Sequence, residues 1–314
     1  MISYSLPPVK KACALKAQIA QHWGVTDLGE PSKIIGIEIL RTSDSISITQ
    51  CQYIETILRK EGMERTNPVV MPMDPNNLPV PNPDLAEENR SNPYAQLLRK
   101  LQYLAMSIWP DIAFAIHRLV SYTGNPSLQH YSMLKRVLRY LAGTRNYGIT
   151  YKKNLQPSIP FLGYSDAGFA NTDEWKSTTG MVFLSAGEAI CWRSKKQSLS
   201  AQSTTEAEYI ALTTAGNETC WLCNLYSELG LPYDFPTPIR CDNLGAISMS
   251  SNPYTTQHSH HIDLKWHTIQ QLVTWGIINP SPCRDADQTA NILTKPLLRP
   301  KHKQHTAEMG LAPI

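Results

Sequence analysis

The sequence of 314 residues predicts an α/β protein: an α+β, mostly helical N-terminal part, then a mixed five-stranded sheet with flanking helices. Apolar residues recur at helical spacing through 94–144, and short strand-like runs follow in 159–195. Beyond residue 195, helical and strand patterns alternate. The length corresponds to about two domains of roughly 150 residues each.

The N-terminal part is expected to begin its regular structure with two strands and to continue mainly as helices. Pro110 and Pro126 separate three consecutive helical patterns, since proline is favoured in the first turn of a helix and in turns. A segment crowded with Pro and Asn is expected as an extended connector. The elements in order are strands 31–42 and 44–50, helix 50–63, connector 67–93, and helices 94–109, 110–124 and 127–144.

The C-terminal part is expected to form the mixed sheet. Gly230 ends a long helical pattern, as glycine commonly does at helix C-termini. The elements in order are strands 159–170, 179–186 and 189–195, helix 203–230, strand 238–243, helix 260–276, a short strand in "IINPSP" and a helix over 284–297. We therefore expect domains at 1–155 and 156–300, and a C-terminal tail at 301–314.

Composition limits the possible functions. The net charge of +3 is mild, so any contact with nucleic acid must come from a local patch. Seven scattered cysteines are typical of a reducing compartment rather than a disulfide framework. No apolar run approaches roughly 18 residues and no secretory signal is recognisable, so we expect an intracellular, cytoplasmic protein without membrane contact.

Three acids stand where an acid is costly for packing. Asp166 interrupts an apolar strand, Asp242 ends another, and Glu208 lies early on the long helix. Singly, each is typical of a turn or a helix cap. Together they could converge on one sheet edge, where carboxylates repel one another unless a cation lies among them. Oxygen ligands suit Mg²⁺, and two such ions can drive phosphodiester cleavage.

The choice of helix ligand is open from the residues alone. The stretch "STTEAE" allows two capping pairs, Ser203 with Glu206 or Thr205 with Glu208. Whichever glutamate caps the helix is less free to bind a metal ion.

Several motifs in consistent order make the resemblance specific. "GYSDAGFANTDEWKSTTGMVFLSAGEAICWRSKKQSLSAQSTTEAEYIAL", "CDNLGAI", "HHIDLKWHTIQQLV" and "ADQTANILTKPL" together resemble the ribonuclease H (RNase H) domain of copia-type retrotransposon polyproteins. "DLGEPSKIIGIEI" and "PDIAFAIHRLVSYTGNPSLQHYSMLKRVLRYLAGT" resemble the reverse transcriptase of that family after its catalytic palm strands, thumb included.

The resemblance implies an RNase H-like sheet and Mg²⁺-dependent cleavage of the RNA strand of RNA·DNA hybrids. It places the metal ligands at Asp166, Glu208 and Asp242, and favours Ser203 with Glu206 as the capping pair. It also implies other retroelement polyprotein parts as partners and a virus-like particle as a possible setting.

Two departures from the family pattern affect activity. Asn291 stands where the family has the fourth acid of the catalytic set, so the second of two Mg²⁺ ions should be bound more weakly and Asn291→Asp should increase cleavage. Asp287, one helical turn earlier, either substitutes in part or is only a first-turn acid. The family's Tyr-x-Asp-Asp motif is missing, since the sequence contains no Asp-Asp pair, so we expect no DNA polymerase activity.

A basic strand end is the candidate nucleic-acid contact. Arg193, Lys195 and Lys196 follow Trp192, and they either contact phosphates or are ordinary exposed charges. Three alternatives remain to cleavage. The first is a non-catalytic remnant that binds RNA or DNA. The second is a metal module built from cysteines and histidines, such as the Cys220–Cys223 pair and the histidines of "HSHHIDLKWH". The third is a decayed reading frame whose product folds poorly.

Overall fold

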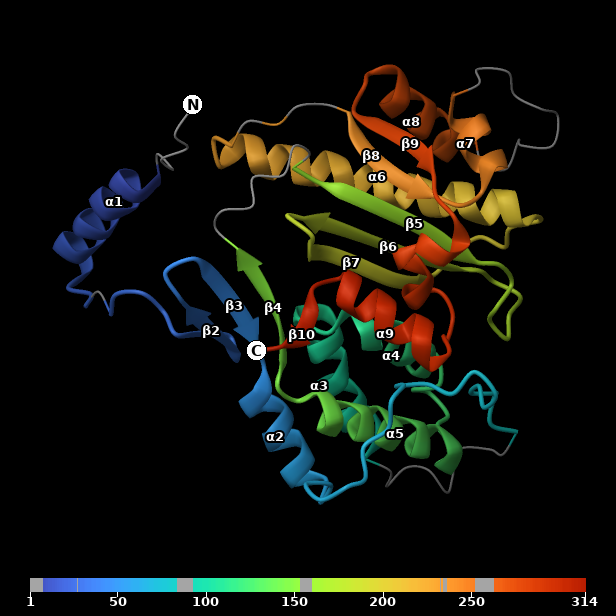
Figure 1. Ribbon diagram of the computed structural model, residues 1–314, viewed down its shortest axis with the longest axis horizontal. Helices are drawn as coiled ribbons and strands as arrows, with labels where there is room; N and C mark the ends of the chain where they lie inside the picture. The colour runs from blue at the N-terminus through green and yellow to red at the C-terminus, as the bar shows by residue number, and fades with distance from the viewer. Residues whose placement is uncertain are drawn as a thin grey trace.

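The computed structural model describes residues 8–26, 28–83, 93–152, 160–231, 233, 236–251 and 263–314, and of 8–13 and 263–266 only the backbone. Figure 1 shows two sheets of the described chain lying one beside the other, with helices around both. Each sheet has five strands within this part of the chain. The first sheet is formed mainly by N-terminal strands and is accompanied by the N-terminal helices, and the second is formed by C-terminal strands and is accompanied by C-terminal helices.

The first sheet is antiparallel throughout, in the order β1-β2-β3-β4-β10. Its strands are β1 (Lys33–Ile34), β2 (Ile37–Arg41), β3 (Ser45–Thr49), β4 (Tyr147–Lys152) and β10 (Leu311–Pro313). The accompanying helices are α1 (Pro8–Trp23), α2 (Cys51–Lys60), α3 (Tyr94–Ser107), α4 (Ala113–Val120) and α5 (Leu128–Thr144). The predicted strands and helices are confirmed in order and type, whereas α1 and β4 are not among them.

The second sheet has the order β7-β6-β5-β8-β9 and is mixed, which confirms the predicted five-stranded architecture. Strand β5 pairs antiparallel with β6 and parallel with β8, and β9 continues parallel to β8. The strands are β5 (Leu162–Gly168), β6 (Thr178–Ser185), β7 (Glu188–Lys196), β8 (Thr237–Cys241) and β9 (Ile278–Pro282). The helices are α6 (Thr204–Glu228), α7 (Leu244–Ser251) and α8 (Asp263–Thr274).

Strand β6 shows why this sheet is buried on both faces. Met181 and Phe183 join a core with residues of α6 and α8, while Val182 and Leu184 join a second core with the N-terminal helices. Side chains alternate between the faces of a strand, so a continuous apolar run serves two cores at once. The core on the side of Val182 and Leu184 is therefore shared by the two halves of the chain.

The C-terminal segment is structured. Where the sequence suggests a tail at 301–314, the structure has helix α9 (Arg299–Glu308) and strand β10, which pairs with β4 of the first sheet. His302, His305, Met309 and Leu311 are buried. Regular structure forms because burial of these residues against the first half compensates the cost of ordering the segment.

The segment 284–297 is not one helix, so that prediction is wrong. It forms two 3-10 turns, Asp285–Asp287 and Thr289–Leu293, separated by Gln288 in an extended conformation. The Gln288 amide caps Ala290 N at 3.3 Å and donates to the Ser165 carbonyl of β5 at 2.9 Å. This buried contact with the sheet favours the break over a continuous helix.

None of the helices in the described ranges combines the length and apolar character that crossing a bilayer would need.

Candidate functional site

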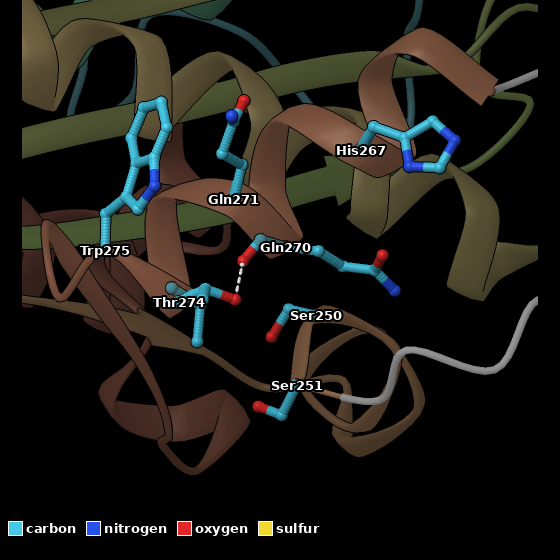
Figure 2. A pocket seen from close by; sticks show the side chains of 8 residues that line it. Ser250, Ser251, His267, Gln270, Gln271, Thr274 and Trp275 are labelled. Atoms are coloured by element: carbon cyan, nitrogen blue, oxygen red, sulfur yellow. Dashed lines mark hydrogen bonds between the residues drawn. The ribbon is translucent and has the colours of Figure 1, made fainter.

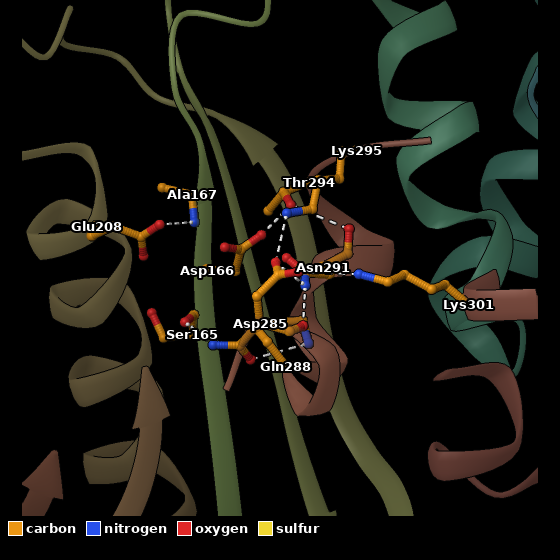
Figure 3. A network of polar contacts seen from close by, with 11 residues as sticks. Ser165, Asp166, Ala167, Glu208, Asp285, Gln288, Asn291, Thr294, Lys295 and Lys301 are labelled. Carbon is orange, nitrogen blue, oxygen red and sulfur yellow. Dashed lines mark hydrogen bonds and ion pairs between the residues drawn. The ribbon is translucent and has the colours of Figure 1, made fainter. Parts of the chain in front are cut away.

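Asp166 lies in the middle of the mixed sheet and is 2% exposed. It pairs with Gly180 on β6, and the turn Thr289–Leu293 packs directly on this pair. A β-carbon at Gly180 would lie 2.6 Å from Thr294 Cγ2 and 2.9 Å from the Ala290 carbonyl oxygen. The missing side chain thus lets Thr294 approach the strand and donate its hydroxyl proton to Asp166 Oδ2 (Figure 3).

The start of α6 decides which glutamate faces the sheet. Ser203 Oγ accepts from Glu206 N at 3.1 Å, and Glu206 Oε2 accepts from Gln202 N at 2.7 Å, so Glu206 belongs to the cap. Glu208 instead points at β5, where its Oε1 accepts from Ala167 N at 3.1 Å (Figure 3). Its Oε2 is buried and has no hydrogen-bond partner within the described part of the chain.

Asp242 directly follows β8, the parallel neighbour of β5, so the chain ends of both strands meet at one edge of the sheet. Ligand atoms of Glu208, Asp242 and Cys241 lie within 4.8 Å of one another. Asp166 is outside that group, since its carboxylate is turned to Thr294. Sequence reasoning missed Cys241; the inward alternation of Thr237, Ile239 and Cys241 on β8 was the available signal.

Burial and neighbouring charges shift the pKa values of the three carboxyl groups. Burial, followed by the charges of Asp166 and Asp242, raises the pKa of Glu208 to about 9. Burial also raises the pKa of Asp166 and of Asp242, and the Lys295 ammonium opposes each of these shifts. Burial likewise raises the pKa of the Cys241 thiol, so this sulfur stays protonated near neutral pH. The cluster is therefore short of positive charge.

Asn291 is fully buried, but its neighbour is Asp285 rather than Asp287. Asn291 Nδ2 donates to the Asp285 carbonyl at 2.9 Å and to Asp285 Oδ1 at 3.1 Å, while Asn291 Oδ1 has no partner among the described residues. Asp287 pairs with Arg284 at 2.7 Å and its side chain is 47% exposed. The shared helical face of Asp287 and Asn291 does not exist, because Gln288 interrupts the helix.

The three basic residues of the predicted nucleic-acid contact lie on β7 and line a small pocket of about 160 Å³. Arg193 pairs with Glu218 at 3.2 Å and Lys196 with Glu174 at 2.8 Å. Lys195 is exposed. Two of the three cations therefore already have an acidic partner within the chain.

A larger cavity lies away from the acids. It measures about 580 Å³ and lies between α7 and α8, lined among others by Ser250, His267 and Trp275 (Figure 2). None of the clustered carboxylates lines it. Among the residues that the structure describes, Cys220 and Cys223 are free thiols outside any metal-type cluster, and His258 to His261 lie outside the described residues.

The fold and the site together define an α/β protein with a desolvated acidic centre on a mixed sheet. The chain is 35% identical over 302 residues to the retrovirus-related Pol polyprotein from transposon RE1 of Arabidopsis thaliana, covering 94% of this chain. It is 34% identical over 297 residues to that from transposon TNT 1-94 of Nicotiana tabacum, covering 91% of this chain. The chain spans 20% and 22% of the length of these two relatives.

The chain belongs to the Pol polyproteins of copia-type retrotransposons, which confirms the resemblance seen in its motifs. No family model matches it. Among solved structures, LC11-RNase H1 in complex with an RNA/DNA hybrid is 14% identical with a TM-score of 0.35, covering 43% of this chain and 93% of that one.

Proposed function

We propose that the chain is a divalent-metal-dependent ribonuclease that cleaves the RNA strand of RNA·DNA hybrids. The observation that carries the proposal is the Glu208 carboxylate, which is 6% exposed and lies near the buried Asp166 and the half-buried Asp242. One of its oxygens has no hydrogen-bond partner among the residues that the structure describes. A buried carboxylate in such a position is costly unless a cation compensates it.

The donor set fits Mg²⁺. Asp166, Glu208 and Asp242 supply hard carboxylate oxygens, which Mg²⁺ prefers. The protonated Cys241 thiol is a soft, neutral group and would not compete as a ligand for such an ion. The Lys295 ammonium offsets the charge of the same acids in the structure, so a bound cation would displace it in part.

Metal ions at this edge would activate a water molecule and stabilise the leaving oxygen of the scissile phosphate. Thr294 holds Asp166 through its hydroxyl, and Ala167 N holds Glu208, so both carboxylates are oriented in advance. Asn291 carries no charge, so the second of two Mg²⁺ ions would be bound more weakly than by four carboxylates unless another acid lies within reach. Lys195 and its neighbours on β7 would contact the phosphate backbone.

Cleavage of a labelled RNA·DNA hybrid by the 314-residue chain, with MgCl₂ and with EDTA, tests the proposal. We expect Mg²⁺-dependent cleavage that Asp242→Asn abolishes and the matched variant Asp287→Asn leaves unchanged. Asp287 is a suitable control because it is an acid of the same region whose side chain is 47% exposed and pairs with Arg284. Equal cleavage by wild type and Asp242→Asn would contradict the assignment.

The same assay separates cleavage from its alternative, a non-catalytic remnant that binds RNA or DNA. Hybrid binding without cleavage at any Mg²⁺ concentration would favour the remnant. We also propose that this chain has no DNA polymerase activity, because its sequence contains no Asp-Asp pair. Primer extension by the purified chain would refute that.

A further inference from the structure

A pair of polar side chains lies beside the acidic centre, in addition to Asp166, Glu208 and Asp242. It consists of Asp285 and Asn291, which come from the two 3-10 turns after β9. Figure 3 shows both side chains on the side of β5 to which Asp166 points. Thr294 links them to Asp166, because its hydroxyl contacts both Asp166 Oδ2 and the Asn291 carbonyl.

The orientation of the Asn291 amide is determined by its neighbours. Its Nδ2 faces two acceptors of Asp285, the main-chain carbonyl and Oδ1, and a flipped amide would place oxygen against oxygen there. Asn291 Oδ1 must therefore point away from Asp285, where it is buried without a partner in the structure. An unpartnered acceptor on a fully buried side chain requires a partner that the described side chains do not supply, and a cation would satisfy both this oxygen and the neighbouring acids.

Asp285 carries the charge that Asn291 lacks. Its carboxylate receives Lys301 Nζ at 3.0 Å and Lys295 Nζ at 3.4 Å, besides the Asn291 amide. These groups, Lys301 first, lower the pKa of Asp285 to about 2. Its charge also reaches Asp242, whose pKa it helps to raise.

We propose that Asp285 is the fourth acidic group of the cation site, and that the side-chain amide of Asn291 orients the Asp285 carboxylate by a hydrogen bond. The pair divides two roles: Asp285 supplies the charge, and Asn291 supplies a hydrogen bond and one neutral oxygen ligand. This inference rests on the proposed function, because it concerns the same cation site.

The pair also reverses the expectation for Asn291→Asp. A carboxylate at position 291 would face the Asp285 carbonyl and Oδ1 at about the same short distances, with two hydrogen bonds lost and like charges in contact. The substitution alone should therefore weaken the folded state instead of restoring a site. Exchanging both residues, Asp285→Asn with Asn291→Asp, again gives the pair one carboxylate and one amide.

Calorimetric titration with MgCl₂ or MnCl₂ tests the metal role on the full 314-residue chain. We expect Asp285→Asn to lower the affinity by at least about tenfold, the double exchange to recover most of it, and the control Asp287→Asn to match wild type. Wild-type affinity in Asp285→Asn, or tighter binding in Asn291→Asp alone, would overturn the proposal.

Melting temperatures in EDTA test the pair independently of any metal ion. We expect Asn291→Asp to melt about 5 °C below wild type, and the double exchange to recover that loss. If wild type binds no divalent ion, the proposed function fails. If Asn291→Asp melts like wild type in EDTA, the pairing of Asp285 with Asn291 fails.

Discussion

Gly180→Ala perturbs the contact on which the acidic centre is built. The added β-carbon would lie 2.6 Å from Thr294 Cγ2, 2.9 Å from the Ala290 carbonyl oxygen and 3.0 Å from Leu293 Cβ, whereas ordinary contacts begin at 3.4 Å. One of these atoms belongs to the backbone, so a rotation of a single side chain cannot relieve the overlap. The turn Thr289–Leu293 must withdraw from β6 by most of an ångström.

The cost follows from the density of the interior. Overpacking of this kind costs typically 1–3 kcal/mol, so we expect the free energy of unfolding to fall by about 2 kcal/mol. At about 2–4 °C per kcal/mol this corresponds to a melting temperature roughly 4–8 °C lower. Thr294 moves with the turn and its hydroxyl bond to Asp166 weakens, so affinity for Mg²⁺ should fall as well.

Urea unfolding in EDTA measures the stability change, and calorimetric titration with MgCl₂ measures the loss of affinity. Gly124→Ala is a matched control, because a β-carbon at Gly124 meets no atom within 4 Å and the backbone there is not left-handed. It should be neutral or slightly stabilising. If Gly180→Ala unfolds at the wild-type midpoint, the close approach of the turn to β6 does not determine the site.

Three further predictions concern the same centre and the contact between the halves. The folded chain keeps a proton on Glu208 up to about pH 9, whereas the unfolded chain loses it near pH 4.5. The free energy of unfolding in EDTA should therefore fall as the pH rises between these values, and melting temperatures across that range measure the fall. Glu208→Gln should flatten this dependence and remove the rise in melting temperature caused by MgCl₂; an unchanged rise would contradict the role of Glu208. Trp192→Phe should lower the free energy of unfolding by about 1–3 kcal/mol in urea, because it leaves the Ala105 carbonyl without its 2.7 Å hydrogen bond between the two halves.

Local pattern was sufficient for much of the architecture. Helices α3, α4 and α5 follow from apolar spacing and the prolines between them, and strands β5 to β8 coincide with the strand patterns of 159–195 and 238–243. The order of strands and helix also predicted that the acids approach one another, and Glu208 and Asp242 do so, whereas Asp166 lies outside their group. The helices and strands themselves depend on neighbours in sequence, so periodicity is sufficient to predict them.

Other elements depend on partners distant in sequence. Strand β10 exists because β4, more than 150 residues earlier, offers it an edge, and α9 is held through the buried His302 and His305. The predicted helix over 284–297 fails for a related reason: Gln288 gains a buried hydrogen bond to the Ser165 carbonyl that a continuous helix would forfeit. Tertiary contacts outweigh local propensity at such places.

The sequence by itself indicated the family, the order of most elements and the candidate acids Asp166, Glu208 and Asp242. Only the tertiary structure decided that Asp285, and not Asp287, is the acid beside Asn291, and that Lys301 of α9 reaches it. The physical reason is that hydrogen bonds and charges act through space over a few ångströms. Two features determine which groups come that close. The absence of a side chain at Gly180 lets the turn Thr289–Leu293 pack against the sheet, and Gln288 interrupts the helix.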